Sequence, residues 1–257
     1  MADPGLEEAI RAAGGITELA RRIGISQPSV SNWSRVPAER VLVVEAATGI
    51  ERAVLRPDLY APASPPPLDD IEEARAKQYA LLAALLRQAP DAALLRRMAR
   101  LEGDATPLGS AHTALAGAAR AAHPGQVARE FFDLFVGVGR GELVPYASYY
   151  LTGFLHERPL ARLRADMRLL GLERAEGSSE PEDHAAILCE IMAVLIGGEF
   201  AATGARQRHF FEKHLALWIG RFFADLETAE HAEFYQPVGT LGRLFIGIET
   251  EAFALPL

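Results

Sequence analysis

The sequence predicts an all-α protein made of two helical parts, and three observations lead to this prediction. Apolar residues recur at the three-and-four spacing of an amphipathic helix along most of the 257 residues. No segment shows the convincing period-two alternation expected of a strand. A proline-rich stretch interrupts the helical pattern after residue 60. We therefore expect a small helical domain at 1–60, a linker at 61–68 and a large domain of about nine helices at 69–257.

The first 60 residues have the layout of a helix-turn-helix module. Apolar residues at helical spacing run from Leu6 to Ala13, and a glycine pair closes this first helix. A second short helix is expected at 17–23, followed by a tight turn at Gly24. Ser26 is a favourable N-cap for a third helix, in whose first turn Pro28 is tolerated. A short helix, a glycine turn and a second helix together predict a helix-turn-helix.

The segment GGITELARRIGISQPSVSNW, with VPAERVLVVEAATG and LRPDLY after it, resembles the Cro-like antitoxin and repressor helix-turn-helix family. This resemblance spans nearly all of the first 60 residues. It implies that the start of the third helix faces the major groove of DNA, because the N-terminal turns of a recognition helix meet base edges. Glutamine and asparagine can each pair bidentately with adenine. The DNA-contacting residues expected on this basis are Gln27, Pro28, Ser31, Asn32 and Arg35.

Two features of the same module argue against DNA binding. Residues 1–62 hold seven arginines, no lysine and eight acids, a net charge of −1, whereas DNA affinity depends largely on neutralising phosphates. The connection between Trp33 and Pro37 is only three residues long, shorter than we expect in relatives. A helical module that serves protein contacts therefore stays open as the alternative.

The linker and the large domain follow. Residues 61–68 are APASPPPL, and four prolines in eight residues favour extended polyproline II. Beyond them, apolar periodicity predicts helices throughout. The expected helices lie at 69–88, 92–101, 107–121, 126–136, 146–157, 159–170, 181–197, 206–226 and 230–253.

The stretch from 130 to 160 is the most distinctive part of the large domain. An apolar helix runs into LFVGVG at 134–139, and PYASYY follows at 145–150. Three of the six tyrosines therefore fall within five residues, and tyrosine suits the gripping of an extended peptide because it joins an apolar face to a hydroxyl. Further on, EPEDH occupies 180–184. Helix capping by Ser179 and Glu182 explains part of this segment without any function.

These motifs, in this order and at this distance, resemble the TorD/DmsD family of redox-enzyme maturation chaperones from about residue 70 to the end. In relatives the position of Tyr146 is often tryptophan. The resemblance implies a cytoplasmic chaperone that binds the twin-arginine signal peptide or the apo form of a molybdopterin-dependent oxidoreductase subunit and delays export until the cofactor is inserted. We expect carboxylates at 182 and 183 to receive the arginines and aromatic side chains to hold the apolar part. The peptide-binding residues expected are Tyr146, Ser148, Tyr149, Phe154, Glu182, Asp183 and His184.

Because Tyr146 and His184 both stand near expected helix starts, we further expect them to share a concave surface. A different class of function stays open beside the chaperone. The chain could be a transcription regulator whose helix-turn-helix reads operator DNA and whose large domain senses the client. The identity of the client and the oligomeric state, including a homodimer, also stay open.

Composition and charge argue against several other classes of protein. The net charge of −8 argues against a general nucleic-acid or anionic-membrane binder. The single cysteine, Cys189, cannot form an internal disulfide, which favours a reducing cytoplasm. The N-terminus lacks the features of a signal peptide, and no uncharged apolar run reaches the ~18 residues of a membrane span, so we expect no membrane insertion.

Enzymatic chemistry is also not expected. The glycines at 137–141 follow a helix rather than a strand and lack the lysine of a phosphate loop. His209 and His214 are five apart, which is unsuited to a shared metal on one helical face. No nucleophile stands beside a base. We therefore expect no catalytic residue, no bound metal and no cofactor.

Overall fold

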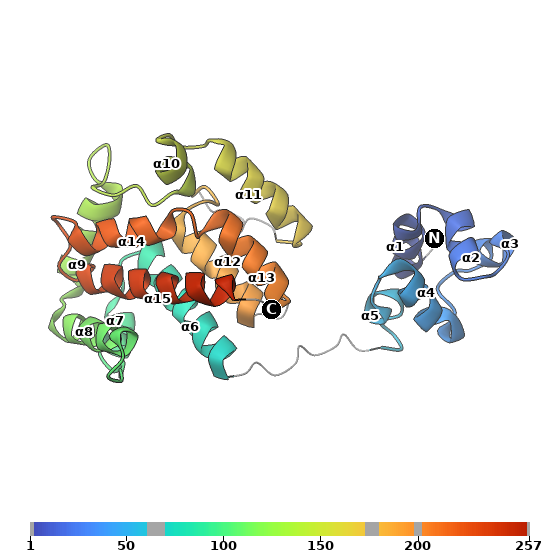
Figure 1. Cartoon of the computed structure of the whole chain (residues 1–257), viewed down its shortest axis with the longest axis horizontal. Coiled ribbons are helices and arrows are strands. Elements are labelled where there is room, and N and C mark those ends of the chain that lie inside the picture. The colour runs from blue at the N-terminus through green and yellow to red at the C-terminus, as the bar shows by residue number, and fades with distance from the viewer. Residues whose placement is uncertain (1–2, 61–69, 173–179, 198–201, 256–257) are drawn as a thin grey trace. The chain divides into compact units, whose positions relative to one another are not determined.

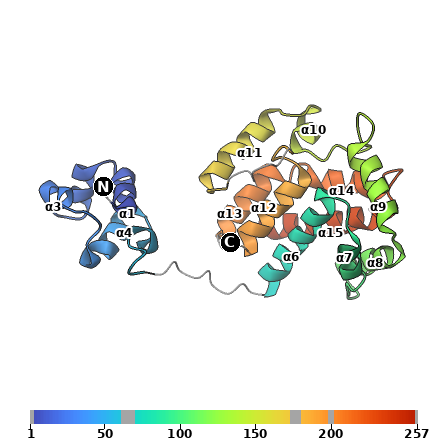
Figure 2. The ribbon, with the colours of Figure 1, turned by 180° about the vertical axis from the view of Figure 1, so that it is seen from behind.

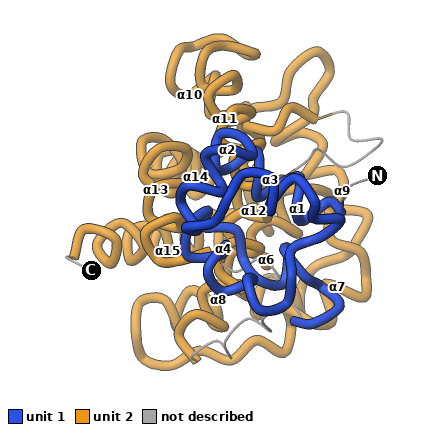
Figure 3. Tube along the Cα trace, turned by 90° about the vertical axis from the view of Figure 1, so that its right-hand side faces the viewer, with its two compact units in different colours: residues 1–66 blue, residues 67–257 orange. Residues whose placement is uncertain are grey.

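The computed structural model describes residues 3–60, 70–172, 180–197 and 202–255. Within these ranges the protein is helical throughout, without strands, which confirms the predicted fold class. The chain divides into two compact units, residues 1–66 and 67–257 (Figures 1 and 3). The predicted linker at 61–68 and the predicted capping residue Ser179 lie outside the described residues. No helix in the described ranges is both long and apolar enough to cross a bilayer.

Unit 1 is a small bundle of short helices. Asp3 begins the first of them by accepting a hydrogen bond from the backbone N–H of Gly5, and Gly14 ends it in the left-handed conformation at φ 91°. Val30, on the third helix, packs into a core shared with Leu19 and Leu55. The elements are α1 (Pro4–Ala13), α2 (Ile16–Arg22), α3 (Gln27–Ser31), η1 (Ala38–Arg40), α4 (Val41–Thr48) and α5 (Arg52–Leu55).

Unit 2 holds the longer helices, among them the apolar helix α12 (Ala185–Gly197), which lies beside α6 (Asp70–Arg87) (Figures 1 and 2). Most residues of α12 are buried, and its closest neighbour is α6. The elements are α6 (Asp70–Arg87), α7 (Ala92–Met98), α8 (Pro107–Ala121), α9 (Pro124–Phe131), η2 (Phe132–Val136), α10 (Ala147–Thr152), α11 (Arg158–Leu169), α12 (Ala185–Gly197), α13 (Gly204–His214), α14 (Ile219–Thr228) and α15 (Gln236–Ala254).

Several predicted helices differ from the observed ones, and the described part of unit 2 holds ten α-helices and the π-helical turn η2 where about nine helices were expected. The helix expected at 126–136 is α9 followed by η2, and the helix expected from 230 begins only at Gln236. The helix expected at 206–226 is two helices, because the chain turns between α13 and α14 and the Trp218 indole donates to the carbonyl of His214. The helix expected at 146–157 ends at Thr152, since Gly153 adopts φ 82°. The helix expected from 181 begins only at Ala185. The residues of the EPEDH motif therefore precede the helix instead of forming its first turn.

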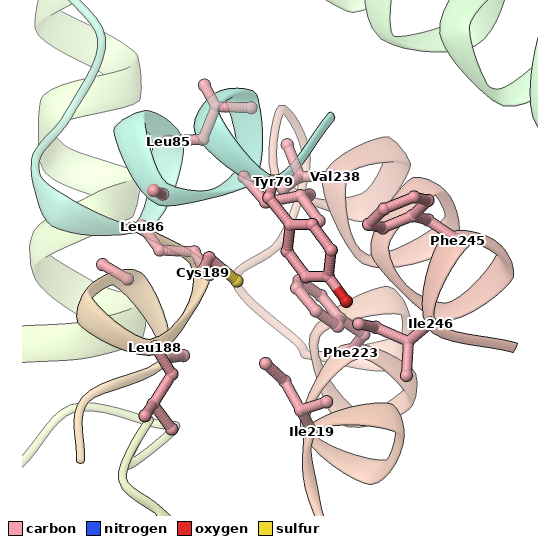
Figure 4. Close-up of a cluster of buried hydrophobic side chains, with 14 of the residues drawn as sticks. Tyr79, Leu85, Leu86, Leu188, Cys189, Ile219, Phe223, Val238, Phe245 and Ile246 are labelled. Carbon is pink, nitrogen blue, oxygen red and sulfur yellow. The ribbon is translucent and has the colours of Figure 1, made fainter. Parts of the chain in front are cut away.

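The core of unit 2 lies where α6, α12, α14 and α15 meet (Figure 4). Tyr79, Cys189 and Phe223 are fully buried there, and burial raises the pKa of the Cys189 thiol to about 12. The thiol is therefore a neutral, space-filling group. The approach of α15 to α14 depends on Gly242, where an added Cβ would stand 2.2 Å from the Phe223 ring. This packing fixes the α12 helix, whose N-terminal end forms the site described next.

Candidate functional site

The starts of α10 and α12 lie side by side because the chain segments that precede them pair. Tyr146 and His184 form an isolated antiparallel bridge. The backbone N–H of Ala147 donates to the carbonyl of Asp183 (3.0 Å), and that of Ala185 donates to the carbonyl of Pro145 (2.8 Å). Successive side chains of an extended chain point to opposite faces. The bridge therefore has two sides, one with Tyr146 and His184 and the other with the residues next to them.

On the first side, Tyr146 and His184 line a pocket of about 90 Å³. Their rings meet edge to face with centroids 5.0 Å apart. The Tyr146 hydroxyl donates to the carboxylate of Glu180, and burial together with this carboxylate raises the pKa of Tyr146. Glu180 is exposed and forms no ion pair with any described residue. We call this site, with its lining residues, the bridge pocket. Its walls also include Leu86, Arg87, Phe131, Phe135, Val136, Ala186 and Ile187.

His184 is neutral in this pocket. Its Nδ1 accepts a hydrogen bond from the backbone N–H of Ala186 (3.0 Å), so His184 caps α12 and carries its proton on Nε2. Burial lowers the pKa of His184 to about 4. At neutral pH the residue therefore offers an N–H donor without a positive charge.

On the second side, the Asp183 side chain is only 1% exposed. Its Oδ2 accepts from the backbone N–H (2.8 Å) and the hydroxyl (2.5 Å) of Ser148, which satisfies a free donor in the first turn of α10. Glu182 is also buried and is paired with Arg164 of α11 at 2.8 Å. Both carboxylates are therefore buried and already bonded in this structure, and their expected contact with arginines stays a prediction. Each carboxylate joins two segments of the fold, and Ser148 is buried as the partner of Asp183 instead of being a surface contact.

The other aromatic residues expected in the groove lie elsewhere. The Tyr149 hydroxyl accepts from the Arg140 guanidinium (2.6 Å), which also lies 5.0 Å from the centre of the ring. Phe154 stands 69% exposed in the loop after α10. Neither residue lines the bridge pocket. The structure thus brings Tyr146 and His184 together but separates them from Tyr149 and Phe154.

The glycine-rich loop brings apolar residues to the bridge pocket. Gly137 ends the π-helical turn η2 with φ 60°, and an added Cβ would stand 2.1 Å from the carbonyl oxygen of Arg140. Only glycine fits this turn without strain. Phe135 and Val136, just before it, line the pocket, and Val136 is half exposed. The glycines therefore shape an apolar rim.

Of the residues that line the bridge pocket, only Tyr146 and His184 were among the expected site residues, and two of the others could have been inferred from the sequence. Glu180, the first residue of the EPEDH motif, is the acid that meets Tyr146. Ile187 is three residues after His184, and helix periodicity places such residues on one face. The motif itself and this spacing are the signals that could have indicated them.

In unit 1, the expected DNA-contacting side chains are all exposed: Gln27, Pro28, Ser31, Asn32 and Arg35. Gln27 donates to the Ser31 hydroxyl (2.6 Å). Most of the arginines already have acidic partners, namely Arg21 and Arg22 with Glu18, Arg35 and Arg56 with Asp58, and Arg52 with Glu45. These pairs leave little unneutralised positive charge for phosphates.

Across the described ranges, no three histidine, cysteine, aspartate or glutamate side chains gather in a way that could hold a metal ion. The bridge pocket offers one exposed carboxylate, one uncharged N–H donor, a tyrosine, an apolar wall and the guanidinium of Arg87, which is paired with Glu190.

Comparison with known proteins confirms both sequence resemblances. Residues 101–224 match the model of the nitrate reductase delta subunit family, and residues 6–64 match that of the bacterial toxin YdaS. The chain is 27% identical over 139 residues to the chaperone protein TorD of Vibrio atlanticus, covering 50% of this chain and 65% of that protein. It is 27% identical over 130 residues to TorD of Vibrio cholerae, and this match covers 47% of this chain and 59% of that protein. It is 30% identical over 119 residues to TorD of Vibrio vulnificus, and this match covers 42% of this chain and 54% of that protein.

The chain thus spans 54% to 65% of the length of these three curated relatives. Among solved structures, a redox enzyme maturation protein from Archaeoglobus fulgidus matches at 19% identity with a TM-score of 0.48. That match covers 72% of this chain and 99% of that one.

Proposed function

We propose that this protein is a maturation chaperone of the TorD type that binds a cationic, apolar segment of an oxidoreductase subunit in the bridge pocket. The pairing of Tyr146 with His184 beside the exposed carboxylate of Glu180 is the observation that carries the proposal. A twin-arginine signal peptide combines adjacent arginines with an apolar run. Glu180 is placed to bond a guanidinium, and charge-assisted bonds of this kind are the strong ones.

The remaining residues of the pocket have roles that fit the same ligand. The wall that includes Phe135 and Ile187 takes up the apolar part of the segment. His184 donates its Nε2–H to a carbonyl of the peptide backbone and, being neutral, does not repel the arginines. Asp183 and Glu182 act as positioning residues, because they hold α10 and α11 against the start of α12.

This binding mode implies how the protein acts. It sequesters the segment without catalysis and without a cofactor of its own, in the cytoplasm, where the client folds. The client is a molybdopterin-dependent oxidoreductase subunit, and its folding around the inserted cofactor withdraws the segment from the pocket and permits export.

A second ligand is proposed for unit 1. The exposed side chains of Gln27 and Asn32 at either end of α3 support contact with operator DNA. The paired arginines of the same unit limit the electrostatic part of this affinity, so we assign the chaperone role to the chain first. We also propose that the two compact units fold as separate domains.

The test of the chaperone proposal compares two tyrosines that are three residues apart. The affinity of the full chain for a synthetic peptide with two adjacent arginines and an apolar run is measured by calorimetry. Tyr146→Ala removes a wall of the bridge pocket and is expected to weaken binding about tenfold or more. Tyr149→Ala removes a ring that does not line the pocket and is expected to change the affinity less than about twofold. Equal losses in both variants would contradict the proposal.

A further inference from the structure

We infer that unit 2 carries a second binding surface, on α10, α11 and α13, that takes an acidic, apolar peptide segment of a partner protein. Ion pairs and shared pocket walls join the three helices, and α10 and α11 lie together along one side of the unit in both ribbon views (Figures 1 and 2). We call this surface the basic face. Its members are Leu151, Phe154, Arg158, Arg162, Lys213 and Leu217.

The charge of the basic face is opposite to that of the chain. The protein has a net charge of −8, yet α11 contains four arginines and a single acid, Asp166. That acid is already bonded to Lys213 (2.6 Å) and His214 (2.7 Å). Arg158 and Arg162 are exposed and form no ion pair with any described residue. Positive charge left unpaired on an acidic protein favours an acidic partner.

An apolar pocket of about 70 Å³ opens between these cations. Leu217, which is 65% exposed, and Leu151 form its outer wall, while the buried side chains of Leu163 and Leu188 lie deeper. Arg162 and Lys213 also line it. The pocket is small, and its apolar lining suits one aliphatic side chain. Phe154, in the loop between α10 and α11, is 69% exposed, and both helices that flank this loop contribute residues to the pocket.

The bridge divides the basic face from the bridge pocket. Tyr146 and His184 line one pocket, and Ala147 and Asp183, their neighbours in the chain, line the other. Asp183 also lines the pocket of the basic face, but the residue is only 1% exposed and its Oδ2 is bonded to Ser148, so the exposed charges on the rim are the cations Arg162 and Lys213. A twin-arginine peptide is repelled by the basic face and attracted by Glu180. The two surfaces therefore select segments of opposite charge and can be occupied together.

A peptide fits the basic face better than an anionic bilayer does. The apolar part is a concave pocket for a single side chain, flanked by cations on its own rim. An acidic segment with one or two leucines satisfies both parts, since the leucine fills the pocket and the neighbouring carboxylates bond to Arg162 and Lys213. A lipid surface supplies anionic headgroups but no side chain of that size.

The test measures the binding of a fluorescein-labelled EELLEE peptide to the full chain by anisotropy. Arg162→Glu is expected to weaken binding about tenfold, equivalent to about 1.4 kcal/mol. The matched control, Arg96→Glu, reverses an exposed arginine on α7 that forms no ion pair with any described residue, and is expected to change the affinity less than about twofold. Glu180→Gln is expected to leave the affinity for EELLEE unchanged and to weaken the binding of the arginine peptide. The proposals for the two surfaces are therefore tested separately.

Three results would overturn the inference. The first is an absence of saturable binding of EELLEE. The second is an equal loss in Arg96→Glu, which would mean that the whole surface attracts acids without a site. The third is binding of phosphatidylserine vesicles that depends on Arg162 while the peptide does not bind, which would make the face a membrane contact.

Discussion

Replacing His184 by asparagine should remove a defined part of the pH dependence of stability. His184 caps α12 through Nδ1, and asparagine is also a favourable N-cap residue, so the variant keeps an acceptor for the N–H of Ala186 but has no titratable group. Burial lowers the pKa of His184 from 6.5 to about 4. Between these values the unfolded chain binds a proton that the folded chain does not. The stabilising contribution is therefore present above pH 6.5 and is lost as the pH falls toward 4.

The magnitude follows from the two pKa values. Between pH 7 and pH 5 the shift corresponds to about 2 kcal/mol of unfolding free energy, to the order of magnitude. The measurement is urea denaturation of the native chain and of His184→Asn at both pH values. Other groups also contribute to the pH dependence of stability. His231, for example, contributes with the opposite sign, because a hydrogen bond to Glu142 raises its pKa. Such contributions are the same in both proteins and cancel in the difference between them. The native chain should lose about 2 kcal/mol more than the variant. Parallel losses would refute the assignment of a buried, neutral His184.

Three further predictions concern packing, domain organisation and DNA. Gly242→Ala should destabilise unit 2 by about 1–3 kcal/mol, because its Cβ would overlap the Phe223 ring. The control is Gly247→Ala on the same helix, whose Cβ would meet nothing within 4 Å and which should be neutral or stabilising. Thermal melting of the two variants and the native chain measures the difference. A fragment of residues 69–257 should melt cooperatively and bind the arginine peptide with the affinity of the full chain, and an aggregated fragment would contradict separate domains. If unit 1 reads an operator, Gln27→Ala and Asn32→Ala should each cost about 1–3 kcal/mol for the selected site, and a genomic pull-down at low salt that enriches no sequence would favour protein contacts.

The helical fold was predictable because helix periodicity and caps are local properties. Leu6 to Ala13 indicate α1 through their spacing. Ser26 stands at the N-cap position of α3 as predicted, but its hydroxyl is bonded to the Ser29 hydroxyl and does not cap the helix. The division of 206–226 into two helices was not predictable, because the turn there is stabilised by the Trp218 indole, a contact that the three-dimensional packing decides. Apolar spacing continues across such a turn and conceals it.

Only part of the candidate site was predictable, because the direction of its side chains also depends on three-dimensional packing. The motifs indicate that 146 and 184 matter, but proximity in sequence does not reveal which way each side chain points. Asp183 stands next to His184 and yet lines the opposite pocket, because the bridge turns alternate residues to opposite sides. Its bond to Ser148 and the pairing of Glu182 with Arg164 are tertiary contacts that leave no trace in the local sequence. These contacts turned two expected ligand-binding carboxylates into positioning residues.

The central claim is that Glu180 receives an arginine of the bound segment beside Tyr146, and a double-mutant cycle tests it most directly. Calorimetry would measure the affinities of the native chain and of Glu180→Gln for the arginine peptide and for the same peptide with glutamine at both arginine positions. Because the two changes remove the same interaction, we predict a coupling energy of about 1–3 kcal/mol. Losses that add to within about 0.5 kcal/mol would show that Glu180 and the arginines do not meet, and the bridge pocket would not be the site.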